Sequence, residues 1–198
     1  MSSADAPEHL VLLLHGRGGA AGDLAWLRNA IPRHWRSLCL QAPLPLGDGF
    51  EWFRVPPDAA AGPLSANVAP AADRLMRWLD DSAPTARVGL VGYSQGGAVA
   101  LHVLRRHPHR FEFVAAFAGF TTIDAEPTDA GLAARPRPVF WARGTADDVI
   151  PPGDIDRMHE FLPDHSLLEE RIYPGAGHEI TPRMAADLTA FIERNTPA

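Results

Sequence analysis

The sequence has few of the features that mark disulfide-rich, nucleic-acid-binding or membrane proteins. Cys39 is the only cysteine among 198 residues, which excludes an intramolecular disulfide and a Cys-x-x-Cys metal site. No run of basic residues stands out and the formal net charge is −6, so we expect no nucleic-acid partner. The longest strongly apolar run near the N-terminus, 10–14, is far too short to span a membrane.

The first ten residues also lack the basic region and apolar stretch of a signal peptide. We therefore predict a cytoplasmic location with no membrane span. Cys39 lies between Leu38 and Leu40, and we expect it to be a small buried hydrophobic residue.

Short apolar runs alternate with segments of helical periodicity along the chain. Strands are expected at 10–14, 37–42, 88–91, 113–117, 139–142 and 167–173. Helices are expected around 24–31, 68–79, 95–106, 155–162 and 184–193. This alternation favours an α/β fold, a mostly parallel sheet with helices on both faces, in one domain over residues 1–198.

Residues 43–66 break this pattern, with five prolines and three glycines in 24 positions. A connection of this length inside a compact domain is often functional. Because it contains Phe50, Trp52 and Phe53, we expect an irregular but ordered loop.

The stretch GYSQGG at 92–97 carries the clearest chemical signal. It fits G-x-S-x-G, the pattern of a nucleophile elbow, where a strand turns sharply into a helix and exposes a serine at the tip. An apolar strand precedes it and a helix follows it, as this geometry requires. The alternative is a glycine-rich turn in which Ser94 is inert.

A serine hydroxyl needs a histidine, oriented by a carboxylate, to act as a nucleophile. In this kind of fold the acid and then the base follow the serine along the chain. Asp147 and Asp148 follow one expected strand and His178 follows the next, at the sheet edge where open α/β folds carry their sites. We predict that His178 is the base. The residues alone barely separate the two aspartates, and Asp124 is a second choice.

Donors for a tetrahedral oxyanion are expected from two backbone N–H groups. One belongs to Gln95, directly after the serine, and the other to the glycine loop 15–19, where Arg17 qualifies because backbone donors do not depend on the side chain. His15 is expected to orient this loop rather than to react. His107 and His109 flank a proline without a carboxylate cluster, so we expect no metal site there.

These motifs together resemble the phospholipase/carboxylesterase family of α/β hydrolases, which includes the acyl-protein thioesterases. The resemblance covers nearly the whole chain. It rests on the segments 15–19, 41–43, 52–53, 92–97, 144–151 and 177–178.

The resemblance implies an α/β-hydrolase fold without a large cap domain, and serine hydrolysis of esters or thioesters without metal or organic cofactor. It maps the acid to Asp147 rather than Asp148, and the oxyanion donors to the backbones of Arg17 and Gln95. Trp52 and Phe53 either wall the acyl pocket or anchor the long loop.

Two departures from the family pattern point away from lipid and lipoprotein substrates. Arg54 stands where members often carry an aspartate, and 55–65 lacks an aliphatic stretch suited to a long acyl channel. The sequence therefore predicts a hydrolase of small-molecule carboxylic esters with short to medium acyl chains.

Several alternatives remain open from the sequence. They are an acyl thioesterase or lysophospholipase, a lactone, amide or carbon–carbon hydrolase with the same triad, and a catalytically silent binding domain. A homodimer is among the oligomeric states that the sequence leaves open.

Overall fold

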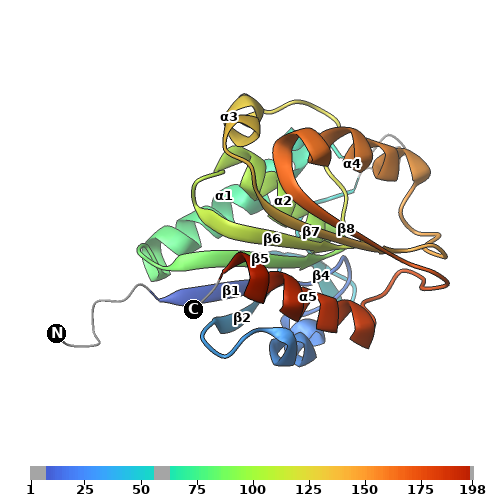
Figure 1. Ribbon diagram of the computed structural model, residues 1–198, viewed down its shortest axis with the longest axis horizontal. Helices are drawn as coiled ribbons and strands as arrows, with labels where there is room; N and C mark the ends of the chain where they lie inside the picture. Colours follow the sequence, from blue (N-terminus) through green and yellow to red (C-terminus); the bar gives the residue numbers. More distant parts are fainter. Residues whose placement is uncertain (1–7, 56–62, 197–198) are drawn as a thin grey trace.

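A twisted sheet of six parallel strands forms the centre of the molecule (Figure 1). The computed structural model describes residues 8–55 and 63–196. Across the sheet the strand order is β2-β1-β5-β6-β7-β8. The strands are β1 (His9–Leu14), β2 (Arg36–Leu40), β5 (Arg87–Tyr93), β6 (Phe111–Phe117), β7 (Arg137–Gly144) and β8 (Ser166–Tyr173).

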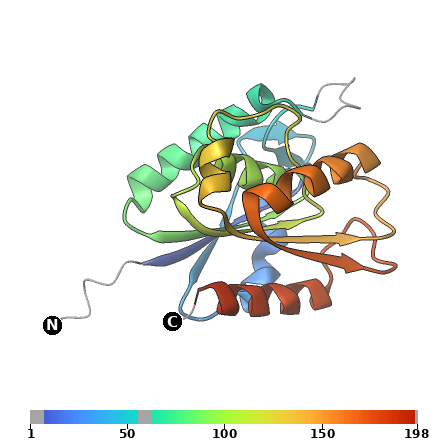
Figure 2. The same ribbon diagram turned by 45° about the horizontal axis from the view of Figure 1, so that its top comes forward.

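Helices cover both faces of this sheet (Figure 2). On one face lie α1 (Ser65–Ser82), α2 (Gln95–Arg106), α3 (Asp129–Ala134) and α4 (Pro152–His165). The 3₁₀ helix η1 (Ala21–Ala30) and α5 (Pro182–Asn195) lie on the other. The predicted α/β fold class is therefore confirmed.

The central strands are buried on both faces, which explains their continuous apolar runs. Leu10, Leu12 and Leu14 of β1 belong to the core under α1 and α2, whereas Val11 and Leu13 pack on the side of η1 and α5. The two-residue period of a strand produces this division. Because side chains pack on both faces of the sheet, the ends of its strands hold the attached loops in defined positions.

The structure differs from the sequence-based expectations in the segment 43–66, at α3 and at Cys39. The segment 43–66 is more regular than expected, because β3 (Leu44–Leu46) and β4 (Gly49–Glu51) pair as an antiparallel hairpin, and α1 already begins at Ser65. The high proline and glycine content of the segment is typical of a loop, so these two strands of three residues each were not predicted. Part of that segment, 56–62, lies outside the described residues. Helix α3 was not expected.

Cys39 is only partly buried on β2, so the expectation of a buried cysteine was wrong. It lies on a strand at the edge of the sheet, where fewer neighbours cover it. In the described segments, no helix combines the length and the apolar character needed to cross a bilayer.

Candidate active site

Ser94 lies at the turn between β5 and α2, in a strained backbone conformation. Its φ of 52° and ψ of −116° are rare for a residue with a side chain. Two glycines make the turn feasible: a Cβ on Gly92 would collide with the Gly96 carbonyl, and one on Gly96 with the Leu14 carbonyl. The predicted strand, turn and helix are all present, and this is the geometry of a nucleophile elbow.

His178 connects the serine to a carboxylate. Its Nε2 lies 2.9 Å from Ser94 Oγ, and its Nδ1 lies 2.8 Å from Asp147 Oδ2. The three residues come from loops after β5, β7 and β8, which meet at the carboxyl edge of the sheet. A neutral imidazole donating from Nδ1 to Asp147 accepts the serine proton at Nε2.

Local hydrogen bonds distinguish the two adjacent aspartates. Asp147 Oδ1 accepts the N–H groups of Val149 and Ile150 at 3.0 and 3.1 Å, which leaves Oδ2 aimed at His178. The Asp147 side chain is 3% exposed. Asp148 is exposed to solvent. The structure thus brings Asp147, and not Asp148, to the histidine.

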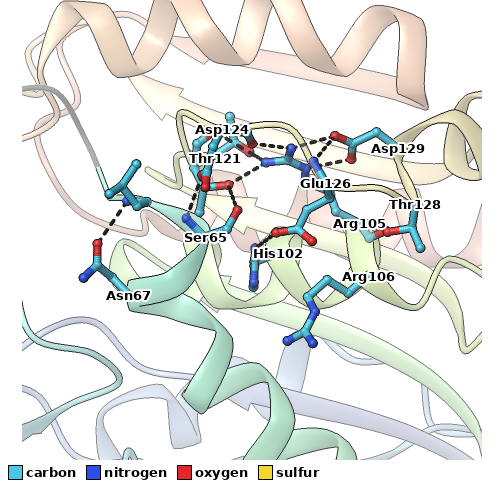
Figure 3. Close-up of polar contacts among 12 residues, drawn as sticks. Ser65, Asn67, His102, Arg105, Arg106, Thr121, Asp124, Glu126, Thr128 and Asp129 are labelled. Carbon is cyan, nitrogen blue, oxygen red and sulfur yellow. Dashed lines mark hydrogen bonds and ion pairs between the residues drawn. The ribbon is translucent and has the colours of Figure 1, made fainter.

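Asp124 belongs to a polar cluster around Arg105, near the C-terminal end of α2, whereas Ser94 lies at its N-terminal end (Figure 3). Its carboxylate accepts the backbone N–H of Ser65 at 2.6 Å, and its carbonyl accepts from Arg105 at 2.8 Å. These bonds join the start of α1 to the loop after β6. The second-choice acid is therefore a structural group.

The glycine loop 15–19 passes beside Ser94 and is fastened to the β3–β4 hairpin. Gly18 N–H donates to the Phe50 carbonyl at 2.8 Å, and Phe50 N–H donates to the Gly19 carbonyl at 2.9 Å. Arg17 and Gln95 both line the cavity that contains Ser94. Gln95 is the first residue of α2, where N–H groups lack partners within the helix and the dipole favours negative charge.

His15 is 1% exposed and forms hydrogen bonds that fix the position of this loop. Its Nδ1 lies 2.7 Å from the Gly16 carbonyl, and its Nε2 accepts the Ala42 N–H at 3.1 Å. Gln41 Nε2 contacts the same ring nitrogen at 3.1 Å. Burial lowers the pKa of His15, which favours the neutral ring that these contacts need. Its contacts are those of a residue that orients the loop.

A buried carboxylate, Glu51, binds two arginines at the rim of the site. It accepts from Arg17 Nε at 2.9 Å and from Arg54 Nη1 at 2.6 Å, and its side chain is 1% exposed. The Arg17 side chain is about half exposed and is held by this pair. No local pattern predicts this contact, because Arg17 and Glu51 are 34 positions apart.

Trp52 and Phe53 occupy different places. Trp52 Nε1 donates to the His15 carbonyl at 2.7 Å, so its ring anchors the segment after β4 against the glycine loop. Phe53 lines the cavity beside Ser94. The structure thus places Trp52 against the glycine loop and Phe53 at the cavity, and a substrate-binding role for the pair stays a prediction.

Two cavities meet at His178. The larger, about 530 Å³, reaches Ser94 and is walled mainly by apolar side chains. Those side chains are Leu46, Phe53, Val55, Pro63, Phe120, Val149, Ile150 and Pro151. The smaller, about 390 Å³, lies across the glycine loop and contains Asp23, Trp26 and Glu179. Ligand pockets commonly measure roughly 300–1,000 Å³.

Tyr93 contacts His178 through both its hydroxyl and its ring. Its hydroxyl donates to the His178 carbonyl at 2.6 Å, and the two ring centroids are 5.1 Å apart. Burial, with the nearby charges of Asp147 and Glu179, raises the pKa of Tyr93 to about 12. Tyr93 belongs to the same motif as Ser94, but the motif leaves its residue type free and so carries no signal for this role.

Among residues 8–55 and 63–196, no three histidine, cysteine, aspartate or glutamate side chains are grouped so that they could hold a metal ion.

Comparisons with known proteins identify a family for this chain. A family model described as Phospholipase/Carboxylesterase matches residues 1–196. Acyl-protein thioesterase 1 of Eremothecium gossypii is 32% identical over 121 residues, which are 58% of this chain and 50% of that protein. The chain thus spans about half the length of this curated relative.

Solved structures match over almost the whole chain. SOBER1 of Arabidopsis thaliana has a TM-score of 0.79 at 22% identity, covering 94% of this chain and 98% of that one, and shows the fold alone. Esterase PE8 has a TM-score of 0.77 at 26% identity, covering 98% and 95%. With the family model matching nearly every residue, the chain belongs to the phospholipase/carboxylesterase family of α/β hydrolases.

Proposed function

We propose that the protein is a serine hydrolase that cleaves carboxylic esters through an acyl-enzyme on Ser94. One observation carries this proposal: Ser94, His178 and Asp147 form a continuous hydrogen-bonded chain of 2.9 and 2.8 Å beside an open cavity. Membership of a family of carboxylesterases and thioesterases supports the same chemistry.

In the first half-reaction, His178 takes the Ser94 proton as Oγ attacks the ester carbonyl. Asp147 holds the imidazole tautomer and stabilises the imidazolium that forms. The tetrahedral oxyanion is stabilised by the backbone N–H groups of Arg17 and Gln95. His178 then protonates the leaving alcohol as the carbon–oxygen bond breaks.

In the second half-reaction, water attacks the acyl-enzyme. His178 removes a proton from the water, the oxyanion forms again at the same donors, and the proton passes to Ser94 Oγ as the acid is released. No step needs a metal or an organic cofactor.

The two cavities suggest how an ester lies in the site. The leaving group must sit beside His178, which protonates it, and the smaller cavity contains His178 but not Ser94. The acyl group then occupies the larger, apolar cavity next to Ser94 and Phe53. Arg17 also lines the smaller cavity but is paired with Glu51, so the charges of Asp23 and Glu179 there disfavour anionic leaving groups.

A thioester is the second candidate substrate, because a relative named acyl-protein thioesterase 1 shares the fold family. The same triad performs that reaction with a thiol as the leaving group. Short to medium acyl chains, a cytoplasmic location and a possible homodimer remain predictions from the sequence.

The test is hydrolysis of p-nitrophenyl esters from acetate to dodecanoate by the wild type and Ser94→Ala. We expect activity with a maximum at short or medium chains, and a loss of roughly 10³-fold or more in kcat in the variant. Equal activity in a folded Ser94→Ala protein would refute the mechanism. A maximum at long chains would overturn the predicted acyl length and favour lipid or acyl-protein substrates.

A further inference from the structure

The Gln95 side chain has a role separate from its backbone N–H. The residue is 2% exposed, and its amide uses both ends. Oε1 accepts the Trp52 N–H at 2.8 Å, and Nε2 donates to the Phe53 carbonyl at 2.8 Å. A primary amide accepts at its oxygen and donates at its nitrogen, so it can make both bonds at once.

The segment held by this amide contributes to both halves of the candidate site. Phe53 walls the cavity beside Ser94. Trp52 Nε1 is bonded to the His15 carbonyl, two residues before Arg17. Gln95 therefore carries one oxyanion donor on its backbone and, through its side chain, fixes the segment that walls the acyl cavity and braces the loop of the other donor.

We propose that the Gln95 side chain is a positioning residue that sets acyl-chain selectivity by fixing Phe53 relative to the oxyanion donors. This inference rests on the proposed esterase function and adds a specificity determinant to it. Its physical basis is the cost of leaving the Trp52 N–H and the Phe53 carbonyl buried without partners, which makes one backbone position strongly preferred.

Gln95→Glu tests the proposal, since it keeps the shape and changes the hydrogen-bonding pattern with pH. A protonated carboxyl can accept from Trp52 and donate to Phe53, as the amide does. The carboxylate can only accept, and it would face the Phe53 carbonyl. Burial favours the protonated form at low pH.

The readout is the ratio of kcat/KM for p-nitrophenyl hexanoate to that for p-nitrophenyl acetate between pH 5.5 and 8.5. Both esters are neutral and share a leaving group, so effects of pH on His178 cancel in the ratio. For Gln95→Glu we expect a ratio near that of the wild type at pH 5.5, falling by about fivefold or more at pH 8.5. The wild-type ratio should stay constant.

Gln95→Met is the matched variant, because it has a similar volume, introduces no charge and makes neither hydrogen bond. We expect its ratio to be low by about fivefold at every pH. If Gln95→Glu fails to fold, this variant gives the same readout.

A merely structural role would lower the melting temperature of folded variants and leave the ratio and its pH dependence as in the wild type. That result in Gln95→Met would overturn the proposal, because this variant makes neither bond at any pH. Absence of ester hydrolysis by the wild type in the same assay would instead count against the proposed function, so the two failures are distinguishable.

Discussion

A polar cluster lies at each end of α2, and the histidines in the two clusters differ in their hydrogen bonds. At the N-terminal end, His178 has a partner on both ring nitrogens, Ser94 and Asp147. At the C-terminal end, His102 is 1% exposed and neither ring nitrogen has a hydrogen-bond partner among the described residues. Its nearest charged contact is Glu126, at 3.9 Å from Nδ1 (Figure 3).

The difference shows which side chain makes most of the hydrogen bonds in each cluster. Near His102, the hydrogen bonds converge on Arg105, which pairs with both oxygens of Asp129 at 2.9 and 2.7 Å and also donates to Thr121 and Thr122. Within the described part of the chain, His102 therefore makes no hydrogen bond in its cluster, whereas His178 connects the other two members of the triad. Substitutions at the two ends should accordingly change different observables, activity at one and stability at the other.

The largest expected effect separates the two adjacent aspartates. Asp147→Asn cannot hold the reactive tautomer of His178, so we expect kcat to fall by roughly 10³–10⁴-fold. Asp148→Asn removes the same charge one position away, on an exposed side chain, and should stay within about twofold. Steady-state kinetics on p-nitrophenyl acetate measure both. Equal losses would show that the acid has been misassigned.

At the other end of α2, Arg105→Met should act on stability. The Arg105 side chain is 3% exposed, and its removal leaves the Asp129 carboxylate, which is 13% exposed, without its cation. We expect the free energy of unfolding to fall by about 3–5 kcal/mol in urea titrations.

Arg106→Met is the matched control, because its pair with Asp73 is partly exposed and should contribute no more than about 1 kcal/mol. If Arg105→Met were no more destabilised than Arg106→Met, the cluster would not organise this end of the helix.

His102 should make the protein sensitive to acid. Burial lowers its pKa from 6.5 to about 4, so the folded protein holds it neutral while the unfolded chain protonates it more readily. Stability associated with this group is complete above pH 6.5 and decreases as the pH falls towards 4, by up to about 3 kcal/mol.

His102→Leu removes that titration without losing a hydrogen bond. We expect the variant to be at least as stable as the wild type at pH 7.5 and to lose less stability between pH 7.5 and 5 in urea titrations. His109→Gln, on an exposed histidine, controls for loss of a histidine in general. An unchanged acid sensitivity in His102→Leu would place its cause in other groups.

The smallest expected effect is at Tyr93. Tyr93→Phe removes the hydrogen bond to the His178 carbonyl and should lower kcat by less than about tenfold. The pH profile of kcat/KM below pH 9 should keep its shape, since the Tyr93 pKa is about 12 and the hydroxyl stays protonated in that range. A shifted profile would mean that Tyr93 takes part in proton transfer.

The sequence predicted those parts of the structure that depend on local pattern. Apolar runs located the six strands of the sheet, and the glycines around Ser94 predicted the elbow because a tight turn leaves no space for side chains. Chain order then predicted which loops carry an acid and a base. The short strands β3 and β4 and the six-residue α3 were missed, because three to six residues show no clear periodicity.

Contacts between distant side chains could not be predicted in the same way. The family resemblance mapped the acid to Asp147, but the residues alone could not, because the choice depends on hydrogen bonds from the Val149 and Ile150 N–H groups that require the loop conformation. The Glu51 pair with Arg17 and the Gln95 bonds to the segment 52–53 depend on how the hairpin folds over the elbow. A sequence shows these residue types without showing that they meet.

The most direct test of the central claim is to identify the residue modified by an alkyl fluorophosphonate, by digesting the labelled wild-type protein and locating the adduct by mass spectrometry. We predict one adduct, on Ser94, and a strongly slowed reaction in His178→Ala. A folded wild-type protein that remains unlabelled, or that carries the adduct on another residue, would contradict it.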